Sequence, residues 1–388
     1  MKDNIMPTYA SQDIRFVKGD GAWLWNEKNE KYLDALSGIA VCSLGHANPE
    51  IAEAISAQAS TLLHTSNLYR VDKQEQLAAQ LCTLTGMDNV FFANSGAEAN
   101  EAAIKVARKY AHSEKIENPL IVTMNNSFHG RTLATLTATG NPKVKEGFSP
   151  LPTGFIHVDY NDISALEKAA EKHSNIVAIL VEPIQGEGGV RIPDNDYLNK
   201  VSSLCQQNDW LLMLDEIQTG VARTGAFLAS QHNDIKPDVI TLAKALGNGV
   251  PIGACLCAGK AAGLLTAGSH GSTFGGNPLA CASALKVLQI VEREQLASRA
   301  EKLGDFICKA LSEKLDSYDS LVEIRHKGLM IGIELDKPCT ELVARALNKH
   351  LLINVVANNT IRLLPPLIIS DEQAEMIVNT LSEIILTF

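Results

Sequence analysis

The chain has 388 residues, more than a single hydrophobic core usually organises, so we expect a large domain and a smaller one. Hydrophobic residues make up 46% and charged residues 20%, which argues against a disordered, collagen-like or coiled-coil protein. With 34 Lys and Arg against 44 Asp and Glu, the net charge is −10, which disfavours binding to nucleic acid or to an anionic membrane.

The N-terminal segment, residues 1–70, is too short to bury a core of its own, so we expect it to pack against the other domains, the small one included. Its motif WLWNEKNEKYLD predicts a β-hairpin. The opening residues lack the apolar stretch of an export signal, and no later run approaches the ~18 apolar residues of a membrane span. We therefore expect a cytoplasmic protein.

Residues 71–295 predict an α/β domain. Short apolar runs alternate with helical patterns, which is typical of a mostly parallel sheet covered by helices on both faces. The expected helices cover 96–112 and the segment after Asn277, an N-cap residue followed by Pro278. The expected strands are 89–94, 119–124, 176–183, 210–216, 238–244 and 252–258.

Residues 296–388 predict a small α+β domain. Its last helix should begin after Ser370, which forms a capping box with Gln373. The other expected elements are a helix at 296–316 and strands near 320–325, 328–335, 352–356 and 360–363.

The eight cysteines include no CxxC pair and lie mostly in apolar runs, so we expect reduced core thiols. Cys255 and Cys257 fall on one face of an expected strand, but two further metal ligands are missing nearby. We predict no metal site.

Two residues of opposite charge end two expected strands. Asp215 closes WLLML, and Lys244 closes VITLA. Both should lie at the carboxyl edge of the sheet, where open α/β folds bind their ligands. Burial of Lys244 would lower its pKa and make its amine a nucleophile toward carbonyl groups. A structural ion pair between the two residues explains the charges equally well.

Two motifs could bind an anion. In NSGAEAN a strand leads directly into a helix, whose first backbone N–H groups attract an anion, although a plain N-cap at Asn94 or Ser95 also explains it. The loop SHGSTFGGN adds the hydroxyls of Ser272 and Thr273. A lysine nucleophile, a buried acid and a phosphate cradle are together what pyridoxal 5′-phosphate requires.

Six motifs resemble, in this order, those of the class III aminotransferases, which belong to the fold-type I pyridoxal-phosphate enzymes. The resemblance covers nearly the whole chain and implies a pyridoxal 5′-phosphate-dependent aminotransferase. The motifs are NSGAEAN, SFHGRT, VEPIQGEGG, LDEIQTG, TLAKALGNG and STFGGNP.

The resemblance implies a role for each matching residue. Lys244 would bind the cofactor aldehyde covalently and then move a proton between the substrate and cofactor carbons. Asp215 would pair with the ring nitrogen, Gln218 would bond the side of the ring hydroxyl, and Phe128 would stack on the ring.

The resemblance also implies a phosphate site shared between two subunits. Ser95, Gly96 and Ala97 would contribute from one chain. Thr273, with Ser272 beside it toward the substrate, would come from the partner subunit, which implies a homodimer.

Two arginines in apolar or Gly-rich sequence, Arg131 and Arg362, are candidates for binding substrate carboxylates. A structural salt bridge is the alternative for each. By resemblance, Arg362 would bind the carboxylate beside the reacting carbon and Arg131 the distal carboxylate. Glu187 would neutralise Arg362 whenever the donor lacks the first carboxylate.

Within the family the chain is most similar to members that transfer the δ-amino group of N2-acetyl-L-ornithine to 2-oxoglutarate. The products are N-acetyl-L-glutamate 5-semialdehyde and L-glutamate, in arginine biosynthesis. Ile39 stands where ornithine-specific members usually have a tyrosine, and it suits an acylated amine better. Cys42 departs from the asparagine common at its position.

Two alternatives stay open. Another ω-aminotransferase would act on ornithine, succinylornithine or 4-aminobutyrate. A cofactor-free Schiff-base lyase, from a different class, would use Lys244 but would have no use for Asp215.

Overall fold

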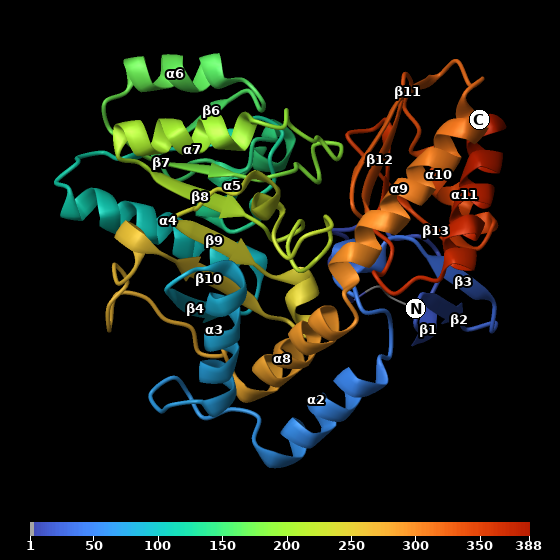
Figure 1. Cartoon of the computed structure of the whole chain (residues 1–388), viewed down its shortest axis with the longest axis horizontal. Coiled ribbons are helices and arrows are strands. Elements are labelled where there is room, and N and C mark those ends of the chain that lie inside the picture. Colours follow the sequence, from blue (N-terminus) through green and yellow to red (C-terminus); the bar gives the residue numbers. More distant parts are fainter. Residues whose placement is uncertain (1–3) are drawn as a thin grey trace.

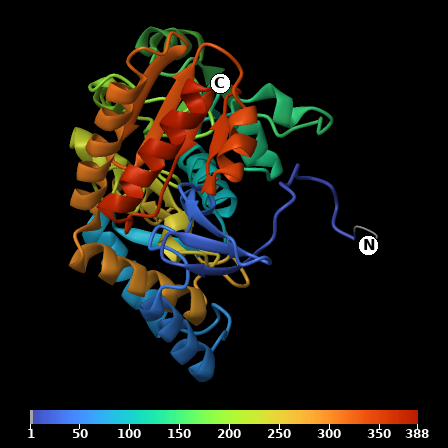
Figure 2. The same ribbon diagram turned by 90° about the vertical axis from the view of Figure 1, so that its right-hand side faces the viewer.

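The computed structural model describes residues 4–388, which form an α/β protein built on three sheets. Figure 1 shows two lobes, one around the large central sheet and one formed by the C-terminal residues. The N-terminal strands lie at the base of the C-terminal lobe, as the rotated view of Figure 2 also shows.

The central sheet has seven strands, and its order is β4-β10-β9-β8-β7-β5-β6. All neighbouring pairs are parallel except those of β10, which runs antiparallel to β4 and β9. The strands are β4 (Asn89–Ala93), β5 (Leu120–Met124), β6 (Phe155–Val158), β7 (Ile176–Val181), β8 (Leu211–Asp215), β9 (Val239–Leu242) and β10 (Gly253–Cys257).

The six predicted strands of this sheet are confirmed, but β6 was not predicted. It has only four residues, FIHV, all of them partly exposed at the edge of the sheet. A run this short and this weakly buried lacks the apolar signal of the inner strands.

Helices cover both faces of the sheet, because alternate strand residues point to opposite sides. Leu211 and Met213 pack toward α4 (Gly96–Ser113), whereas Leu212 and Leu214 pack toward α6 (Ile163–Lys172) and α7 (Tyr197–Asn208). By the same alternation Asp215, the last residue of β8, lies on the α4 side.

Other helices surround this core. α8 packs against both α2 and α3 below the sheet, and Asn277 caps α8 as predicted. These helices are α2 (Pro49–Thr61), α3 (Asp72–Thr85), α5 (Leu133–Ala138) and α8 (Pro278–Arg293), with short 3-10 turns η1 (Pro142–Lys145), η2 (Ala229–Asn233), η3 (Lys244–Gly247) and η4 (Gly259–Ala261).

The C-terminal lobe has a four-stranded antiparallel sheet of order β11-β12-β15-β14, packed against helices. The capping box of Ser370 and Gln373 is confirmed, with backbone-to-side-chain distances of 3.1 and 2.9 Å. The elements are α9 (Leu296–Leu315), β11 (Leu321–Lys327), β12 (Met330–Leu335), α10 (Glu341–Asn348), β14 (Asn354–Val356), β15 (Thr360–Leu363) and α11 (Asp371–Leu386). Only α10 was not predicted, because its two buried residues, Leu342 and Ala346, give too short a periodic pattern.

The N-terminal sheet has the order β1-β2-β3-β13. The predicted hairpin is confirmed as β2 and β3, which pair antiparallel. β3 also pairs parallel with β13, a strand of the C-terminal residues. The four strands are β1 (Phe16–Asp20), β2 (Trp23–Asn26), β3 (Lys31–Asp34) and β13 (Leu351–Leu352).

The short element α1 (Ser37–Ala40) follows β3 and is left-handed. Its four residues have φ values of 47°, 63°, 65° and 59° in chain order. Only Gly38 adopts this region without strain, so the β-branched Ile39 is held there by its surroundings. Backbone bonds from Ile39 and Ala40 to the Leu36 carbonyl hold the turn.

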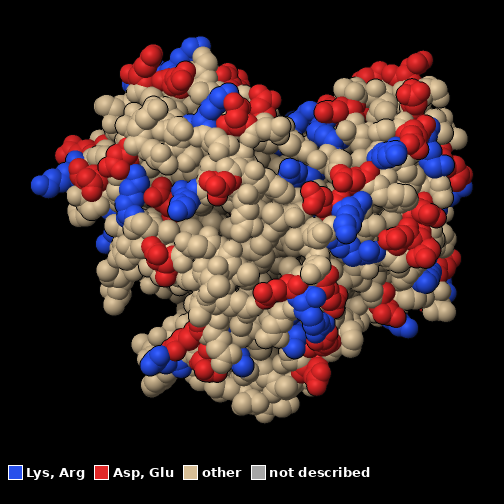
Figure 3. All heavy atoms as spheres, viewed as in Figure 1, with Lys and Arg blue, Asp and Glu red and all other residues tan. Residues whose placement is uncertain are grey.

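Figure 3 shows acidic and basic side chains mixed over the visible face, which is hollowed between the two lobes. Within residues 4–388, no helix combines the length and apolar character required to cross a membrane. In the same stretch, no three His, Cys, Asp or Glu side chains are grouped so that they could hold a metal ion.

Candidate functional site

A cavity of about 420 Å³ lies at the carboxyl edge of the central sheet. Strands β4, β5, β7, β8 and β9 all end at this edge, and β10 begins there, so the segments that follow them converge. The polar lining consists of Asn94, Ser95, His129, Arg131, Glu182, Glu187, Asp215, Gln218 and Lys244.

The Asp215 carboxylate is buried and is held by three donors. Its Oδ2 accepts hydrogen bonds from Asn100 Nδ2 at 2.7 Å and His129 Nδ1 at 2.8 Å, and its Oδ1 accepts one from the Ile217 amide at 3.1 Å. Asn100 comes from α4, the helix that this face of β8 packs against. These donors hold the carboxylate in one orientation at the wall of the cavity.

Lys244 follows β9 as the first residue of η3, and it lines the same cavity. Burial and, next in size, the positive charge of Arg362 lower the pKa of its amine to about 8. Its backbone has φ of 43°, a left-handed conformation that a lysine rarely adopts. The alternative explanation of these two charges was a structural ion pair between Lys244 and Asp215. Among the described residues no such ion pair is present, so the Lys244 amine is not tied to that carboxylate.

The anion-binding motif is placed as predicted, at the start of α4. Ser95 caps the helix by accepting a bond from the Glu98 amide at 3.2 Å, and the Gly96 and Ala97 amides precede the first intrahelical bond. A side chain at Gly253, the first residue of β10, would collide with the Ser95 carbonyl. That glycine therefore lets the helix start lie directly on the sheet.

The predicted substrate residues Arg362 and Glu187 and the predicted cofactor residue Gln218 form one cluster around the buried guanidinium of Arg362. Arg362 Nη1 donates to Glu187 Oε1 at 2.7 Å and to Gln218 Oε1 at 3.1 Å, while its Nη2 is buried without a partner among the described residues. Burial raises the pKa of the Glu187 carboxyl, but the charge and hydrogen bond of Arg362, together with Lys244 and Gln218, outweigh it and hold that pKa below its usual range. Gln218, predicted to face a ring hydroxyl, thus also contacts the arginine.

Arg131 and Phe128 lie together on another wall. The Arg131 guanidinium is 5.5 Å from the centre of the Phe128 ring, a cation–π contact. Within residues 4–388 no carboxylate pairs with Arg131, which leaves its donors free to bind an anion.

Ser272 and Thr273 are not part of the cavity lining formed by residues 4–388 of this chain. Ser272 Oγ accepts a bond from Asn94 Nδ2 at 3.2 Å, so it lies just outside, whereas Thr273 is exposed to solvent. The structure therefore groups the other predicted site residues at the cavity, with Arg362 bonded to its lining residues Glu187 and Gln218, and leaves Ser272 and Thr273 outside the lining.

Three site residues were not predicted: Asn100, His129 and Glu182. Glu182 follows β7 as Asp215 ends β8, and that position at a strand end was a usable signal. Its Oε2 accepts the Phe128 amide at 3.0 Å, and burial raises the pKa of its carboxyl to about 7. Asn100 and His129 carried no such signal, because only folding brings them to Asp215.

The residues present fit pyridoxal 5′-phosphate. The cavity offers a partly neutral amine for an aldehyde, a fixed carboxylate for a protonated ring nitrogen, and free amides at a helix start for a phosphate. A doubly wound sheet with this constellation at its carboxyl edge defines an enzyme of carbonyl and amine chemistry.

Comparison with known proteins agrees with this class. The family model for class-III aminotransferases matches residues 6–385. The chain is 52% identical to an acetylornithine aminotransferase of Nitrosomonas europaea over 385 residues, covering 99% of this chain and 98% of the relative. It is 47% identical to the enzyme of that name from Methanothermobacter thermautotrophicus, with 98% and 96% covered.

Solved structures give the same result. An ornithine aminotransferase from Toxoplasma gondii has a TM-score of 0.96 at 35% identity, covering 99% of this chain and 93% of that one. An acetylornithine aminotransferase from Elizabethkingia anophelis has a TM-score of 0.87 at 37% identity, with 99% and 96% covered. The chain belongs to the class-III aminotransferase family.

The Asn100 contact can be tested by substitution. Asn100→Ala should lower the free energy of unfolding by about 1–3 kcal/mol, because it removes one donor from buried Asp215 and the acceptor of the Thr241 hydroxyl. Urea denaturation measures this change. Thr241→Val is the control, because it removes a hydrogen bond to Asn100 but keeps the donors to Asp215. If only Asn100→Ala retains the cofactor less well, the loss of retention is due to the missing bond to the Asp215 carboxylate. Equal retention in both variants would contradict it.

Proposed function

We propose that the chain is a pyridoxal 5′-phosphate-dependent transaminase that moves the δ-amino group of N2-acetyl-L-ornithine to 2-oxoglutarate. The products are N-acetyl-L-glutamate 5-semialdehyde and L-glutamate, as in arginine biosynthesis. One observation supports the chemistry above all. Lys244, whose pKa is lowered, lines the same cavity as the hydrogen-bonded Asp215 carboxylate and the free backbone amides at the start of α4. The full-length relatives at 52% and 47% identity support the donor substrate.

Lys244 is the residue that handles the proton. An amine with a pKa of about 8 has a neutral fraction of roughly a tenth at pH 7, enough to act as a nucleophile and then as a base. Lys244 holds the cofactor aldehyde and moves the proton at the reacting carbon of the substrate. When bound, pyridoxal 5′-phosphate supplies an electron-accepting ring that stabilises negative charge on that carbon.

Asp215, which Asn100 and His129 hold in place, would pair with the ring nitrogen of the bound cofactor and favour its protonated form. The Gly96 and Ala97 amides, with Ser95, bind the phosphate at the positive end of α4. Phe128, which lines the cavity, would stack on one face of the ring.

Arg362 serves the substrate that carries a carboxylate beside the reacting carbon, which is glutamate or 2-oxoglutarate. A δ-amine donor has no carboxylate there, so the buried guanidinium requires another anion, and Glu187 provides it at 2.7 Å. Arg131, whose donors are free, binds the distal carboxylate of either substrate. One cavity thereby accepts two different substrates in turn.

Ornithine is the second candidate donor, because the Toxoplasma ornithine aminotransferase has a TM-score of 0.96. The identity of 35% to that protein is lower than the 52% to the Nitrosomonas relative, and Ile39 offers no hydrogen bond to a free α-amino group. Both features favour the acylated donor. The cytoplasmic location expected from the sequence, and the predicted boundaries near residues 70 and 295, stay predictions.

We further propose a homodimer in which Thr273 completes the partner's phosphate site. Thr273 is exposed in the single chain, and several large apolar side chains are exposed as well. The segment before β1 extends away from the body in Figure 2. Met6, Tyr9, Leu68 and Tyr69 are each at least 70% exposed, an arrangement typical of a surface that another chain covers.

The donor preference is tested by steady-state kinetics with N2-acetylornithine, ornithine, succinylornithine and 4-aminobutyrate. We expect the highest kcat/KM with N2-acetylornithine, because the most similar full-length relatives reported above support that donor and Ile39 offers no hydrogen bond to a free α-amino group. Lys244→Ala should be folded, colourless and inactive with every donor. A clear preference for ornithine would overturn the donor, and turnover by Lys244→Ala would overturn the chemistry.

The role of Glu187 is tested with Glu187→Gln. Its side chain is 38% exposed, so the penalty for leaving Arg362 unpaired lies below the about 3–5 kcal/mol of a fully buried pair. We expect kcat/KM for N2-acetylornithine to fall roughly tenfold, while kcat/KM for glutamate is kept or raised. Glu383→Gln, which breaks an exposed pair with Lys349 in the C-terminal lobe, is the control and should change neither value. An equal fall for both substrates would contradict the proposed neutralisation.

Hybrid dimers test whether Thr273 acts across the subunit boundary. Thr273→Val and Lys244→Ala homodimers should both have low activity. A hybrid of the two variants has one site with both residues intact only if Thr273 serves the partner's Lys244. We expect differently tagged, purified hybrids to recover up to half of the wild-type activity; no recovery would show that Thr273 acts within its own chain or not at all.

A further inference from the structure

Glu182 is a buried carboxylate in the cavity wall that has no role in the transamination proposed above. It follows β7, and only 6% of the residue is exposed. Its Oε2 accepts a hydrogen bond from the Phe128 amide at 3.0 Å, and its Oε1 accepts one from the Gly186 amide at 3.3 Å. Within residues 4–388, neither amide has another acceptor. One side chain therefore joins two loops, the one after β5 and the one after β7.

Each of these loops carries a wall of the cavity that the proposed reaction uses. Phe128, in the loop after β5, lines the cavity and would stack on the cofactor ring. Gly186, in the loop after β7, directly precedes Glu187, whose carboxylate pairs with Arg362 at 2.7 Å. The two bonds to Glu182 thus fix one wall relative to the other.

The loop after β7 is closely packed around these bonds. A side chain at Gly186 would collide with the side chain of Gln218, so the backbone at this position lies directly against that residue. Gln185 Nε2 also donates to the Asn125 carbonyl at 2.8 Å, which is a second bond between the same two loops. A shift of the loop would therefore move the Gly186 backbone against Gln218.

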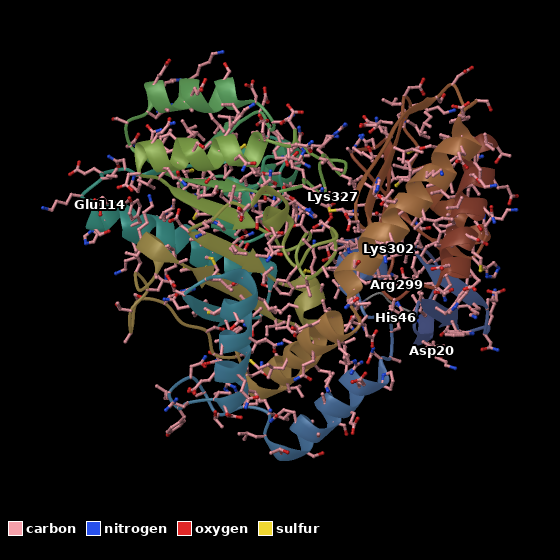
Figure 4. The ribbon with its side chains drawn as sticks, viewed as in Figure 1. Asp20, His46, Glu114, Arg299, Lys302 and Lys327 are labelled. Carbon is pink, nitrogen blue, oxygen red and sulfur yellow. The ribbon has the colours of Figure 1, made fainter. Side chains whose placement is uncertain are left out.

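The same loop reaches the boundary between the lobes. Ile184, two residues after Glu182, lines a cleft of about 130 Å³ together with Lys327, which Figure 4 labels at this boundary. Farther along, Arg325 donates to the Gly189 carbonyl at 2.6 Å. The C-terminal lobe thus anchors the end of the loop, and Glu182 anchors its start to the wall of Phe128.

The environment of Glu182 makes one substitution informative. Burial raises the pKa of this carboxyl to about 7, against the lowering effects of His129 and of the two amide bonds. A neutral glutamine of the same length therefore spares the fold a charge that burial disfavours. Glutamine has a single acceptor oxygen, so it can keep only one of the two bonds.

We propose that Glu182 is a positioning residue for the transamination: its two carboxylate oxygens clamp the loop of Phe128 to the loop of Glu187. The wall that would stack on the ring and the wall that neutralises Arg362 thereby keep one separation. The effect on catalysis rests on the proposed function, whereas the clamp itself does not.

The clamp is tested by hydrogen–deuterium exchange of the holoenzyme, measured at single amides by mass spectrometry. In Glu182→Gln, at least one of the Phe128 and Gly186 amides should exchange ~10-fold faster than in the wild type, because it loses its acceptor. Glu182→Met, which offers no oxygen acceptor, should accelerate both amides. Unchanged exchange of both amides in the folded variants would overturn the clamp, whether or not the enzyme is a transaminase.

Kinetics and circular dichroism test the positioning. In Glu182→Gln we expect kcat/KM for N2-acetylornithine to fall roughly tenfold. The value for glutamate should fall less, since only the δ-amine donor needs Glu187 beside Arg362. The visible circular-dichroism band of the bound cofactor should weaken, because Phe128 is no longer held in one place. Faster exchange with an unchanged band and unchanged kinetics would overturn the positioning role alone.

Asp238→Asn is the matched control. Burial raises the pKa of the Asp238 carboxyl, which accepts the Leu212 amide at 2.8 Å, but this residue precedes β9 at the opposite edge of the sheet. The substitution should change neither the exchange of the Phe128 and Gly186 amides, nor the band, nor either kcat/KM.

The wild type decides if both Glu182 variants fail to fold. Its Phe128 and Gly186 amides should exchange at least ~10-fold more slowly than amides of an unstructured peptide. An unprotected amide at either residue would overturn the clamp.

Discussion

A carboxylate removed from water at the end of β8 is the constraint on which the rest of the cavity depends. An ionised group in that position costs several kcal/mol unless donors replace its water, and Asp215 recruits them from α4, from the loop after β5 and from its own backbone. Each donor ties a separate segment to the sheet edge. The same recruitment leaves the Lys244 amine free, because Asp215 is satisfied without it.

Buried arginines fasten the parts of the chain around this centre. Arg223 is fully buried and donates to the carbonyls of Leu329 and Pro365 and to the Ser43 hydroxyl, so it joins the N-terminal segment to the C-terminal lobe. Arg325 donates to the Gly189 and Val190 carbonyls, next to Glu187. The loop that carries Glu187 is therefore anchored on the C-terminal sheet, which also carries Arg362 on β15. The Arg362–Glu187 pair at the cavity wall depends on how these two lobes are held together.

Sequence patterns were sufficient wherever one local signal decided the outcome. Apolar runs predicted the inner strands, and the capping box predicted α11. The proposed phosphate site was inferred from a strand that leads directly into a helix. Lys244 and Asp215 were found because each interrupts an apolar strand at its carboxyl end, and parallel strands place such ends at one edge. Edge strand β6 and helix α10 were not predicted, because few of their residues are buried. An element with few buried residues has too few apolar positions to show a strand or helix periodicity.

The sequence by itself determined the class of fold, the six motifs and the choice of Lys244 as the proposed nucleophile, because each of these depends on residues that are neighbours in the chain. Only the tertiary structure decided which partner each charge received. Asn100 and His129 lie 115 and 86 positions from Asp215, and Glu187 lies 175 from Arg362. No short-range pattern encodes such pairs. They form because a charge buried by the packing of distant segments must find its hydrogen bonds among whatever side chains that packing brings within reach.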